Sequence, residues 1–134
     1  MRLPLIVLAL LVPFAAAAKE RALFLAGQYA TAAQCKKLRA VEAGGPNNVS
    51  TAPEVLDADG FKSWEGRCEF TKVFEHEPGE TWLVFMVCSE GMTATQATYV
   101  FVKHEGEDVF EVHSSADQDG PEIYRRCDAM KGNK

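Results

Sequence analysis

Residues 63–88 have the sequence SWEGRCEFTKVFEHEPGETWLVFMVC, in which two strand-like segments flank the turn Glu77-Pro78-Gly79-Glu80. In the first segment, Ser63 to His76, apolar and polar positions alternate, as in a strand with one buried face. The apolar parity holds Trp64, Gly66, Cys68, Phe70 and Phe74. Lys72-Val73 interrupts the alternation, which indicates a β-bulge. The second segment, Thr81 to Cys88, is apolar at both parities, which predicts a strand covered on both faces.

Short segments on both sides of this hairpin continue the same pattern between turn residues. The expected strands are Val55-Leu56, Phe61, 97–104, 108–113 and 123–127, with a loop at 89–95. Before them, Thr31 to Val41 is rich in good helix formers and predicts a helix. Successive short strands with tight turns predict a mainly β fold. We expect a small antiparallel meander that closes into a barrel or half-barrel, with a short N-terminal helical or loop segment over the open side.

The chain contains four cysteines, separated by gaps much wider than the close pairs typical of a zinc site. Cys68 and Cys88 are equidistant from Pro78 in the hairpin turn, so they should face each other on adjacent strands. Cys35 and Cys127 then pair by elimination. The sequence therefore predicts a domain stapled by the disulfides Cys68–Cys88 and Cys35–Cys127.

Residues 1–18 have the order of parts found in a secretory signal peptide. Arg2 is positive, Leu3 to Phe14 is apolar, and Ala15 to Ala18 supplies small residues for cleavage. The alternative is a membrane anchor, but a spanning helix needs about 20 apolar residues, and this run is shorter and interrupted by prolines. We expect a cleaved signal followed by a single exported β domain, 19–134, that is periplasmic or secreted and not stably inserted in a membrane.

Several segments of the chain carry aromatic, glycine and cysteine residues in a familiar arrangement. They are Leu25-Ala26-Gly27-Gln28-Tyr29 before Cys35, Gly60-Phe61 before Trp64-Glu65 and Cys68, Trp82-Leu83-Val84 before Cys88-Ser89-Glu90-Gly91, and Tyr124-Arg125-Arg126-Cys127. In these segments the chain resembles a group of small periplasmic four-cysteine proteins of alphaproteobacteria, which implies a fold and a compartment but no activity. It is also similar in size, export and β content to periplasmic inhibitors of c-type lysozyme, but their Ser-Gly-x-x-Tyr signature is absent.

Charge and motifs argue against several classes of function. A net charge of −5 disfavours nucleic acid as a partner, because phosphates require Lys and Arg. There is no G-x-S-x-G motif, and His76, His104 and His113 lack the spacing of a local metal-ligand pair, although the first two precede turns at one end of the expected sheet. We therefore expect no enzyme activity, cofactor or metal. Trp64, Trp82 and Tyr99 fit either core packing or a surface that binds sugar or lipid.

The remaining pattern favours binding without catalysis. We expect a periplasmic binding module that inhibits or regulates another envelope protein; the alternatives are a small barrel that carries an apolar ligand and, third, an envelope hydrolase. In a meander, the turns around 77–80 and 105–108 lie at the same end. They would place Glu77, Glu80, Glu105 and Glu107 on one acidic rim. Such a rim attracts a basic envelope or host protein, or simply keeps the protein soluble.

Overall fold

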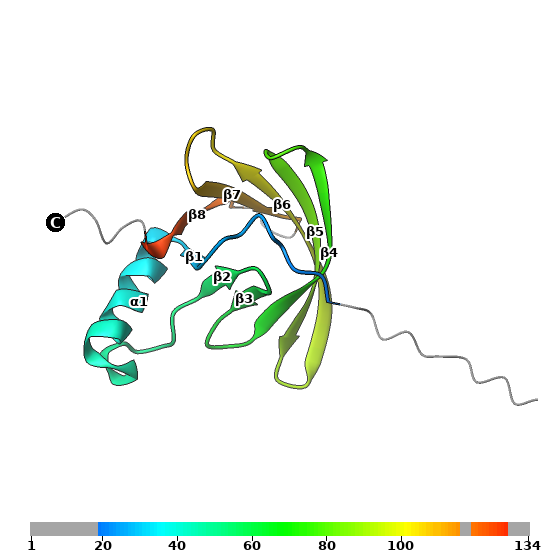
Figure 1. Ribbon diagram of the computed structural model, residues 1–134. Coiled ribbons are helices and arrows are strands. Elements are labelled where there is room, and N and C mark those ends of the chain that lie inside the picture. Colours follow the sequence, from blue (N-terminus) through cyan, green and yellow to red (C-terminus); the bar gives the residue numbers. More distant parts are fainter. Residues whose placement is uncertain (1–18, 116–118, 129–134) are drawn as a thin grey trace, which may run out of the picture.

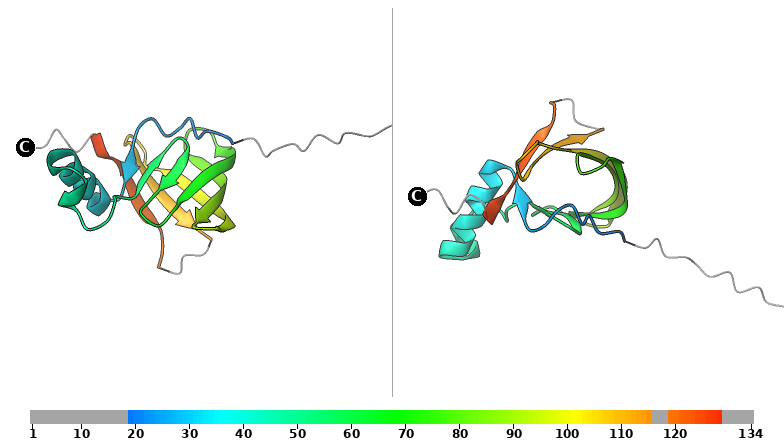
Figure 2. Two further views of the ribbon diagram at one scale, coloured as in Figure 1. Left: turned by 90° about the horizontal axis from the view of Figure 1, so that it is seen from below. Right: turned by 45° about the horizontal axis from the view of Figure 1, so that its top comes forward.

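The structure, a computed structural model, describes residues 19–115 and 119–128, and over these residues the chain forms a closed antiparallel β-barrel with one α-helix beside it (Figure 1). The predicted signal peptide, residues 1–18, lies outside the described residues. The prediction of a mainly β meander is confirmed. Of the two expected outcomes, barrel or half-barrel, the structure has the closed barrel (Figure 2).

The barrel strands follow one another in chain order, each antiparallel to the next. Their bounds are β1 Tyr29–Ala30, β2 Val55–Asp57, β3 Gly60–Lys62, β4 Arg67–Glu77, β5 Thr81–Glu90, β6 Thr93–Lys103, β7 Val109–Ser114 and β8 Glu122–Arg126. β1 closes the ring because Tyr29 pairs with Leu56 of β2 on one side and with Arg126 of β8 on the other. The shortest strand therefore joins the two ends of the sheet, and its pattern was too short to be predicted.

The hairpin of β4 and β5 has the predicted pairing, with Cys68 opposite Cys88, but β4 contains a bulge at Thr71. An extra residue reverses the facing of the residues that follow it. Phe70 is therefore buried in the core, whereas Phe74, predicted to share its face, is 45% exposed on the outer surface.

Two further expectations about β5 are wrong. Residues 89–95 are mostly strand rather than loop, because β5 continues to Glu90 and β6 begins at Thr93 after a turn at Gly91-Met92. β5 is also covered on one face only. Phe85, on its outer face, is 37% exposed and packs edge-on against Phe74, with 5.9 Å between ring centroids.

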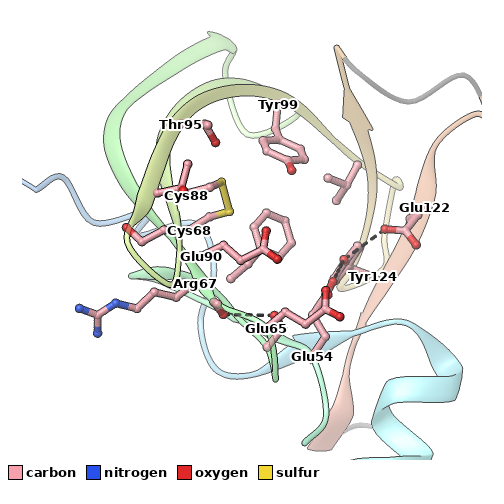
Figure 3. Close-up of a pocket in the computed structure, with 16 residues that line it drawn as sticks. Glu54, Glu65, Arg67, Cys68, Cys88, Glu90, Thr95, Tyr99, Glu122 and Tyr124 are labelled. Atoms are coloured by element: carbon pink, nitrogen blue, oxygen red, sulfur yellow. Dashed lines mark hydrogen bonds between the residues drawn. A yellow bond between two sulfur atoms is a disulfide. The ribbon is translucent and has the colours of Figure 1, made fainter. Parts of the chain in front are cut away.

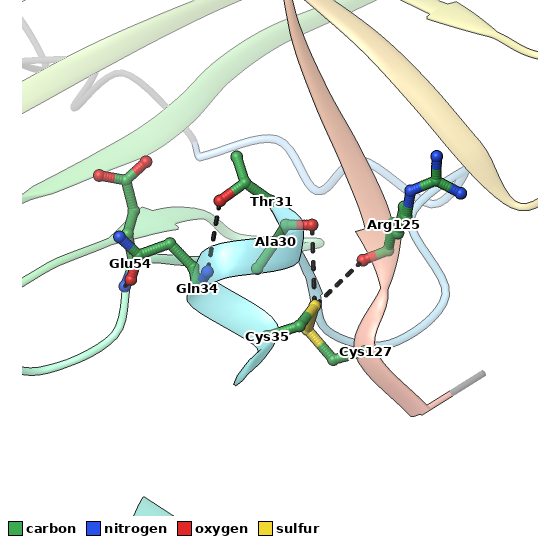
Figure 4. The surroundings of a disulfide bond; sticks show 7 residues. All are labelled: Ala30, Thr31, Gln34, Cys35, Glu54, Arg125 and Cys127. Atoms are coloured by element: carbon green, nitrogen blue, oxygen red, sulfur yellow. Dashed lines mark hydrogen bonds between the residues drawn. A yellow bond between two sulfur atoms is a disulfide. The ribbon is translucent and has the colours of Figure 1, made fainter. Parts of the chain in front are cut away.

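The helix α1, Ala32–Gly44, begins where the sequence predicted it. The Thr31 side chain caps it by accepting a hydrogen bond from the Gln34 backbone N–H. α1 lies outside the ring beside β1 and β8, so it does not cover an open side (Figure 2). The disulfide Cys35–Cys127 joins its first turn to the residue after β8, with 5.3 Å between the Cα atoms (Figure 4).

Aromatic side chains fill one end of the barrel, which we call the closed end. Trp82 is 5% exposed, and Phe24 of the N-terminal segment stacks on it with 4.2 Å between ring centroids. Phe101 and Phe110 complete this cluster. Backbone hydrogen bonds tie the N-terminal segment down, with the Ala22 N–H donating to the Ala58 carbonyl at 2.8 Å. The closed end is therefore a packed aromatic core.

Candidate binding site in the barrel mouth

The opposite end of the barrel, which we call the mouth, contains a pocket of about 370 Å³ (Figure 3). Its lining comes from most of the strands and from the connection between β3 and β4. The lining residues used below are Glu54, Phe61, Glu65, Gly66, Arg67, Cys68, Cys88, Glu90, Thr95, Tyr99, Glu122 and Tyr124. A concave site of this size is in the range that holds small molecules, about 300–1,000 Å³.

Aromatic rings separate the pocket from the core. Phe61 and Tyr124 belong both to the buried core and to the pocket lining, and Tyr99 packs against the same core. The Phe61 ring lies 5.3 Å from that of Tyr99 and 5.5 Å from that of Tyr124, measured between centroids. The packed interior therefore ends at a floor of three rings.

The disulfide Cys68–Cys88 forms part of the pocket wall (Figure 3). It joins directly opposed residues of β4 and β5, with 3.9 Å between the Cα atoms. Nearby, a Cβ atom at Gly66 would collide with the backbone carbonyl oxygen of Ser89. The absence of a side chain there lets the segment before β4 approach β5 closely. Covalent and close backbone contacts thus hold the mouth in shape.

Four glutamates surround the pocket. We call them the mouth carboxylates: Glu54, Glu65, Glu90 and Glu122. The backbone N–H of Glu54 donates to the Gln34 side chain of α1 at 2.9 Å, so the helix positions this part of the rim. Glu90 has the inward parity of Cys88 on β5, and Glu122 has that of Tyr124 on β8.

Two of these carboxylates converge on the Tyr124 hydroxyl. It lies 2.9 Å from Glu54 Oε1 and 3.3 Å from Glu122 Oε2 (Figure 3). Burial, followed by the negative charges of Glu54 and Glu122, raises the pKa of Tyr124 well above its usual value. The hydroxyl therefore remains a neutral donor between two acceptors.

Among the described residues that line the pocket, Arg67 is the only basic one. Its guanidinium is directed away from the mouth, whereas the Glu90 side chain lies within it (Figure 3). Arg67 Nε is 3.7 Å from Glu69, a residue outside the pocket lining. The positive charge of Arg67 is thus placed where it does little to offset the mouth carboxylates.

The residues of the predicted acidic rim lie at the closed end, away from the pocket. The β4–β5 and β6–β7 turns are adjacent there, since the Lys103 N–H donates to the Glu80 carbonyl at 2.8 Å. Their sequence neighbour Asp108 accepts from the Tyr29 hydroxyl at 2.6 Å and pairs with Arg126 at 3.3 Å. The role of Glu77, Glu80, Glu105 and Glu107 in binding a partner stays a prediction.

The histidines and tryptophans singled out in the sequence are not all gathered at one site. His104 and His113 both contact Glu111 on the outer surface, at 3.5 and 2.8 Å. Among the described residues, no group of three or more His, Cys, Asp or Glu side chains is placed to hold a metal ion. Trp82 is in the core, whereas Trp64 is 67% exposed.

Sequence reasoning missed the mouth carboxylates. A signal for two of them was present, because Glu90 continues the inward parity of Trp82, Val84, Met86 and Cys88, and Glu122 shares that of Tyr124. Ending the expected strand at Cys88 removed Glu90 from it. Glu54 and Glu65 lie outside strands and have no periodic signal.

Comparison of the chain with protein-family models, curated proteins and solved structures found no match. The described part of the chain contains no helix with the length and apolar character needed to cross a membrane. The class of protein that the geometry defines is a small closed β-barrel with two disulfides, packed at one end and hollow at the other.

Proposed function

We propose that this protein is a non-catalytic binding module whose binding site is the mouth pocket. The observation that carries this proposal is that the core ends at Phe61, Tyr99 and Tyr124, which leaves about 370 Å³ of the barrel unfilled. Interiors of small barrels are otherwise filled by side chains. A hollow floored by aromatic rings provides contact area for a small ligand.

The character of the pocket distinguishes this proposal from a carrier of a purely apolar ligand. The rings of the floor suit an apolar body, but Glu54, Glu90 and Glu122 at the rim do not, because an apolar group beside a carboxylate removes its water without replacing it. A ligand with both an apolar and a polar part fits better. Among the described residues, those that line the pocket include no histidine and only disulfide-bonded cysteines, which favours binding over nucleophilic catalysis.

The proposed compartment is the periplasm or the exterior of the cell. Two disulfides support it, since such bonds persist in oxidising compartments. The signal-peptide pattern of residues 1–18 supports it independently. We predict that the purified native protein begins within two residues of Lys19. Intact-mass analysis of the native protein measures this directly, and a chain that retains Met1 would contradict it.

A second candidate is binding of another envelope protein, as an inhibitor or regulator, through the outer face of β4 and β5. The exposed, edge-on pair Phe74 and Phe85 favours it, because exposed aromatic groups are common at protein interfaces. The resemblance to small periplasmic four-cysteine proteins agrees with either candidate.

Titration of ¹⁵N-labelled mature protein with a panel of small molecules, followed by NMR, distinguishes the two candidates. We expect the panel to shift the amide signals of Phe61, Thr95 and Tyr124. Thr95→Trp, which places a large ring in the mouth, should abolish these shifts. Thr98→Trp is the matched control, because Thr98 lies on the same strand but faces outward beside Phe85.

Two results would overturn the mouth as the binding site. One is binding that Thr95→Trp leaves unchanged. The other is a set of shifts confined to Phe74, Phe85 and their neighbours, which would favour the second candidate.

A further inference from the structure

The residues that line the mouth pocket limit the chemical class of ligand that it can bind. Resting on the proposed binding function, we infer that the pocket holds a small amphipathic cation, with a flat apolar body against the aromatic floor and an ammonium or guanidinium group among the mouth carboxylates. The cavity and its floor limit the size and shape of the ligand, and the charge of the rim selects among the ligands that would fit.

The aromatic floor of the pocket determines the shape and polarity of the part of the ligand that it contacts. Phe61, Tyr99 and Tyr124 line the bottom of the pocket, so a flat apolar group placed against them gains burial and ring stacking. The sulfur atoms of Cys68 and Cys88 add a polarisable wall. A long flexible chain gains less, because the packed core lies directly beneath the floor.

The hydrogen-bonding groups at the rim determine which polar group of a ligand fits there. The Tyr124 hydroxyl has one proton to donate, but both Glu54 and Glu122 lie within reach of it. The hydroxyl can therefore donate fully to only one of the two carboxylates at a time. An ammonium carries three N–H donors and a guanidinium five, so either group can serve both carboxylates at once.

A neighbouring hollow provides a contrast within the same protein. About 350 Å³ in volume, it lies between the N-terminal segment and β3 and β4. Most of its charged side chains are paired: Lys19 with Glu69 at 2.8 Å, Arg21 with Asp59 at 3.0 Å, and Lys62 with Asp57 at 2.8 Å. The hydrogen bond from Lys19 holds the pKa of Glu69 below its usual value.

Among the described residues, the mouth has four carboxylates and one basic side chain, Arg67, which points away (Figure 3). Its negative potential is therefore open to a ligand. A bare metal ion is a poor match, because the described carboxylates are not grouped as metal ligands and such an ion would gain nothing from the apolar ring faces of the floor. An organic cation uses both the floor and the rim, and rings near its charge add a cation–π attraction.

The test uses three probes with one ring system and different charge: tryptamine, which carries an ammonium; tryptophol, which carries a neutral hydroxyl; and indole-3-propionate, which carries a carboxylate. Binding to the mature protein is measured by calorimetry at pH 7 and low salt, with NMR to locate each probe. We expect tryptamine to bind about tenfold more tightly than tryptophol, a difference of about 1.4 kcal/mol, because its ammonium is attracted to more than one mouth carboxylate at once. Indole-3-propionate should bind most weakly.

The double variant Glu54→Gln, Glu122→Gln tests whether the mouth carboxylates cause this order. Glutamine keeps an oxygen that accepts from Tyr124 but removes the charge. We expect the preference for tryptamine over tryptophol to fall to about twofold or less. Glu105→Gln with Glu107→Gln is the matched control, since it removes the same total charge at the closed end and should keep the preference.

Three sets of results would contradict the inferred ligand class, the mouth as the binding site, or both. If tryptophol binds in the mouth as tightly as tryptamine, or indole-3-propionate binds best, the inferred charge class is wrong while the proposed binding function stands. If both double variants weaken tryptamine equally, the mouth carboxylates are not its partners and the inference fails. If none of the probes shifts the signals of Phe61, Thr95 or Tyr124, or if Thr95→Trp binds them unchanged, both the inference and the mouth as the binding site are overturned.

Discussion

The two ends of the barrel differ although the same strands build both. Along β6, Phe101 is fully buried among aromatic rings at the closed end, whereas Thr95 lies exposed in the mouth. The two disulfides also differ in position, since Cys68–Cys88 lies in the pocket wall and Cys35–Cys127 ties α1 to the residue after β8, outside the barrel core. The closed end is built for stability, and the mouth is left with space and charge that packing does not use.

The disulfides offer the largest test of this comparison. Cys35→Ala with Cys127→Ala should lower the free energy of unfolding by about 4–5 kcal/mol and Cys68→Ala with Cys88→Ala by about 3 kcal/mol, because the bonds link residues 92 and 20 positions apart and the longer loop loses more chain entropy. Urea denaturation of both double variants measures the difference. A greater loss from the mouth pair would show that stability resides at the mouth.

Single substitutions on β6 test the same contrast without breaking a covalent bond. Phe101→Ala should cost about 3–5 kcal/mol, because it removes a buried ring and leaves a cavity among its aromatic neighbours. Thr95→Ala on the same strand should change stability by no more than about 0.5 kcal/mol. Thermal and urea unfolding give both values. Similar losses at the two positions would mean that the mouth is as tightly packed as the closed end.

Tyr29 provides a pH-dependent test of the closed end. Burial, and then the hydrogen bond to Asp108, raises the pKa of Tyr29 to about 12. Tyr29→Phe should therefore cost about 1.5–3 kcal/mol at pH 7, the range for a hydrogen bond to a charged group. An unfolded tyrosine has a pKa of about 10.

The native state thus holds the Tyr29 proton more tightly than the unfolded state. Its contribution is complete below pH 10 and is lost as the pH rises through 12. The stability difference between wild type and Tyr29→Phe should narrow over that interval in urea titrations at pH 7, 9 and 11. A difference that widens with pH would contradict this assignment.

The smallest expected effect on stability is at the mouth carboxylates. Glu54→Gln with Glu122→Gln should change the free energy of unfolding by about 0.5 kcal/mol or less, because these groups lie at the rim and the Tyr124 hydroxyl keeps an acceptor. Asp108→Asn at the closed end should cost more, since it weakens contacts with Tyr29 and Arg126. Equal losses in urea denaturation would indicate that the mouth carboxylates have a structural role.

Most of the barrel could be predicted from local patterns, and the pocket could not. The turn at 77–80 and the alternation around it were enough to place Cys68 opposite Cys88. A bulge was expected one or two residues after Thr71, but the expected alternation still placed Phe74 on the face of Phe70, whereas any bulge between them turns Phe74 to the surface. β1 has two residues and hence no period to detect.

The pocket depends on where the core stops, which is a property of volumes in three dimensions. Nothing in the alternation of β6 distinguishes Tyr99, which ends the core, from Phe101, which is inside it. Glu54 and Glu65 reach the mouth from segments outside the strands. Their positions depend on how the barrel closes, and the spacing of residues in the sequence does not predict that closure.

The pairing of β1 with β8 has a consequence for the order in which the protein can fold. Tyr29 and Arg126 stand near opposite ends of the described chain, so the ring cannot be completed until nearly all of that chain is present. The hairpins of β4 to β7 need only neighbouring residues and can form early, whereas β1 lacks its β8 partner and keeps an unpaired edge in the meantime. The two disulfides should form in the same order as the strand pairs. Cys68 meets Cys88 within one hairpin, but Cys35 has to remain reduced until Cys127 arrives, and during that wait a bond to Cys68 or Cys88 is the principal misfolding risk.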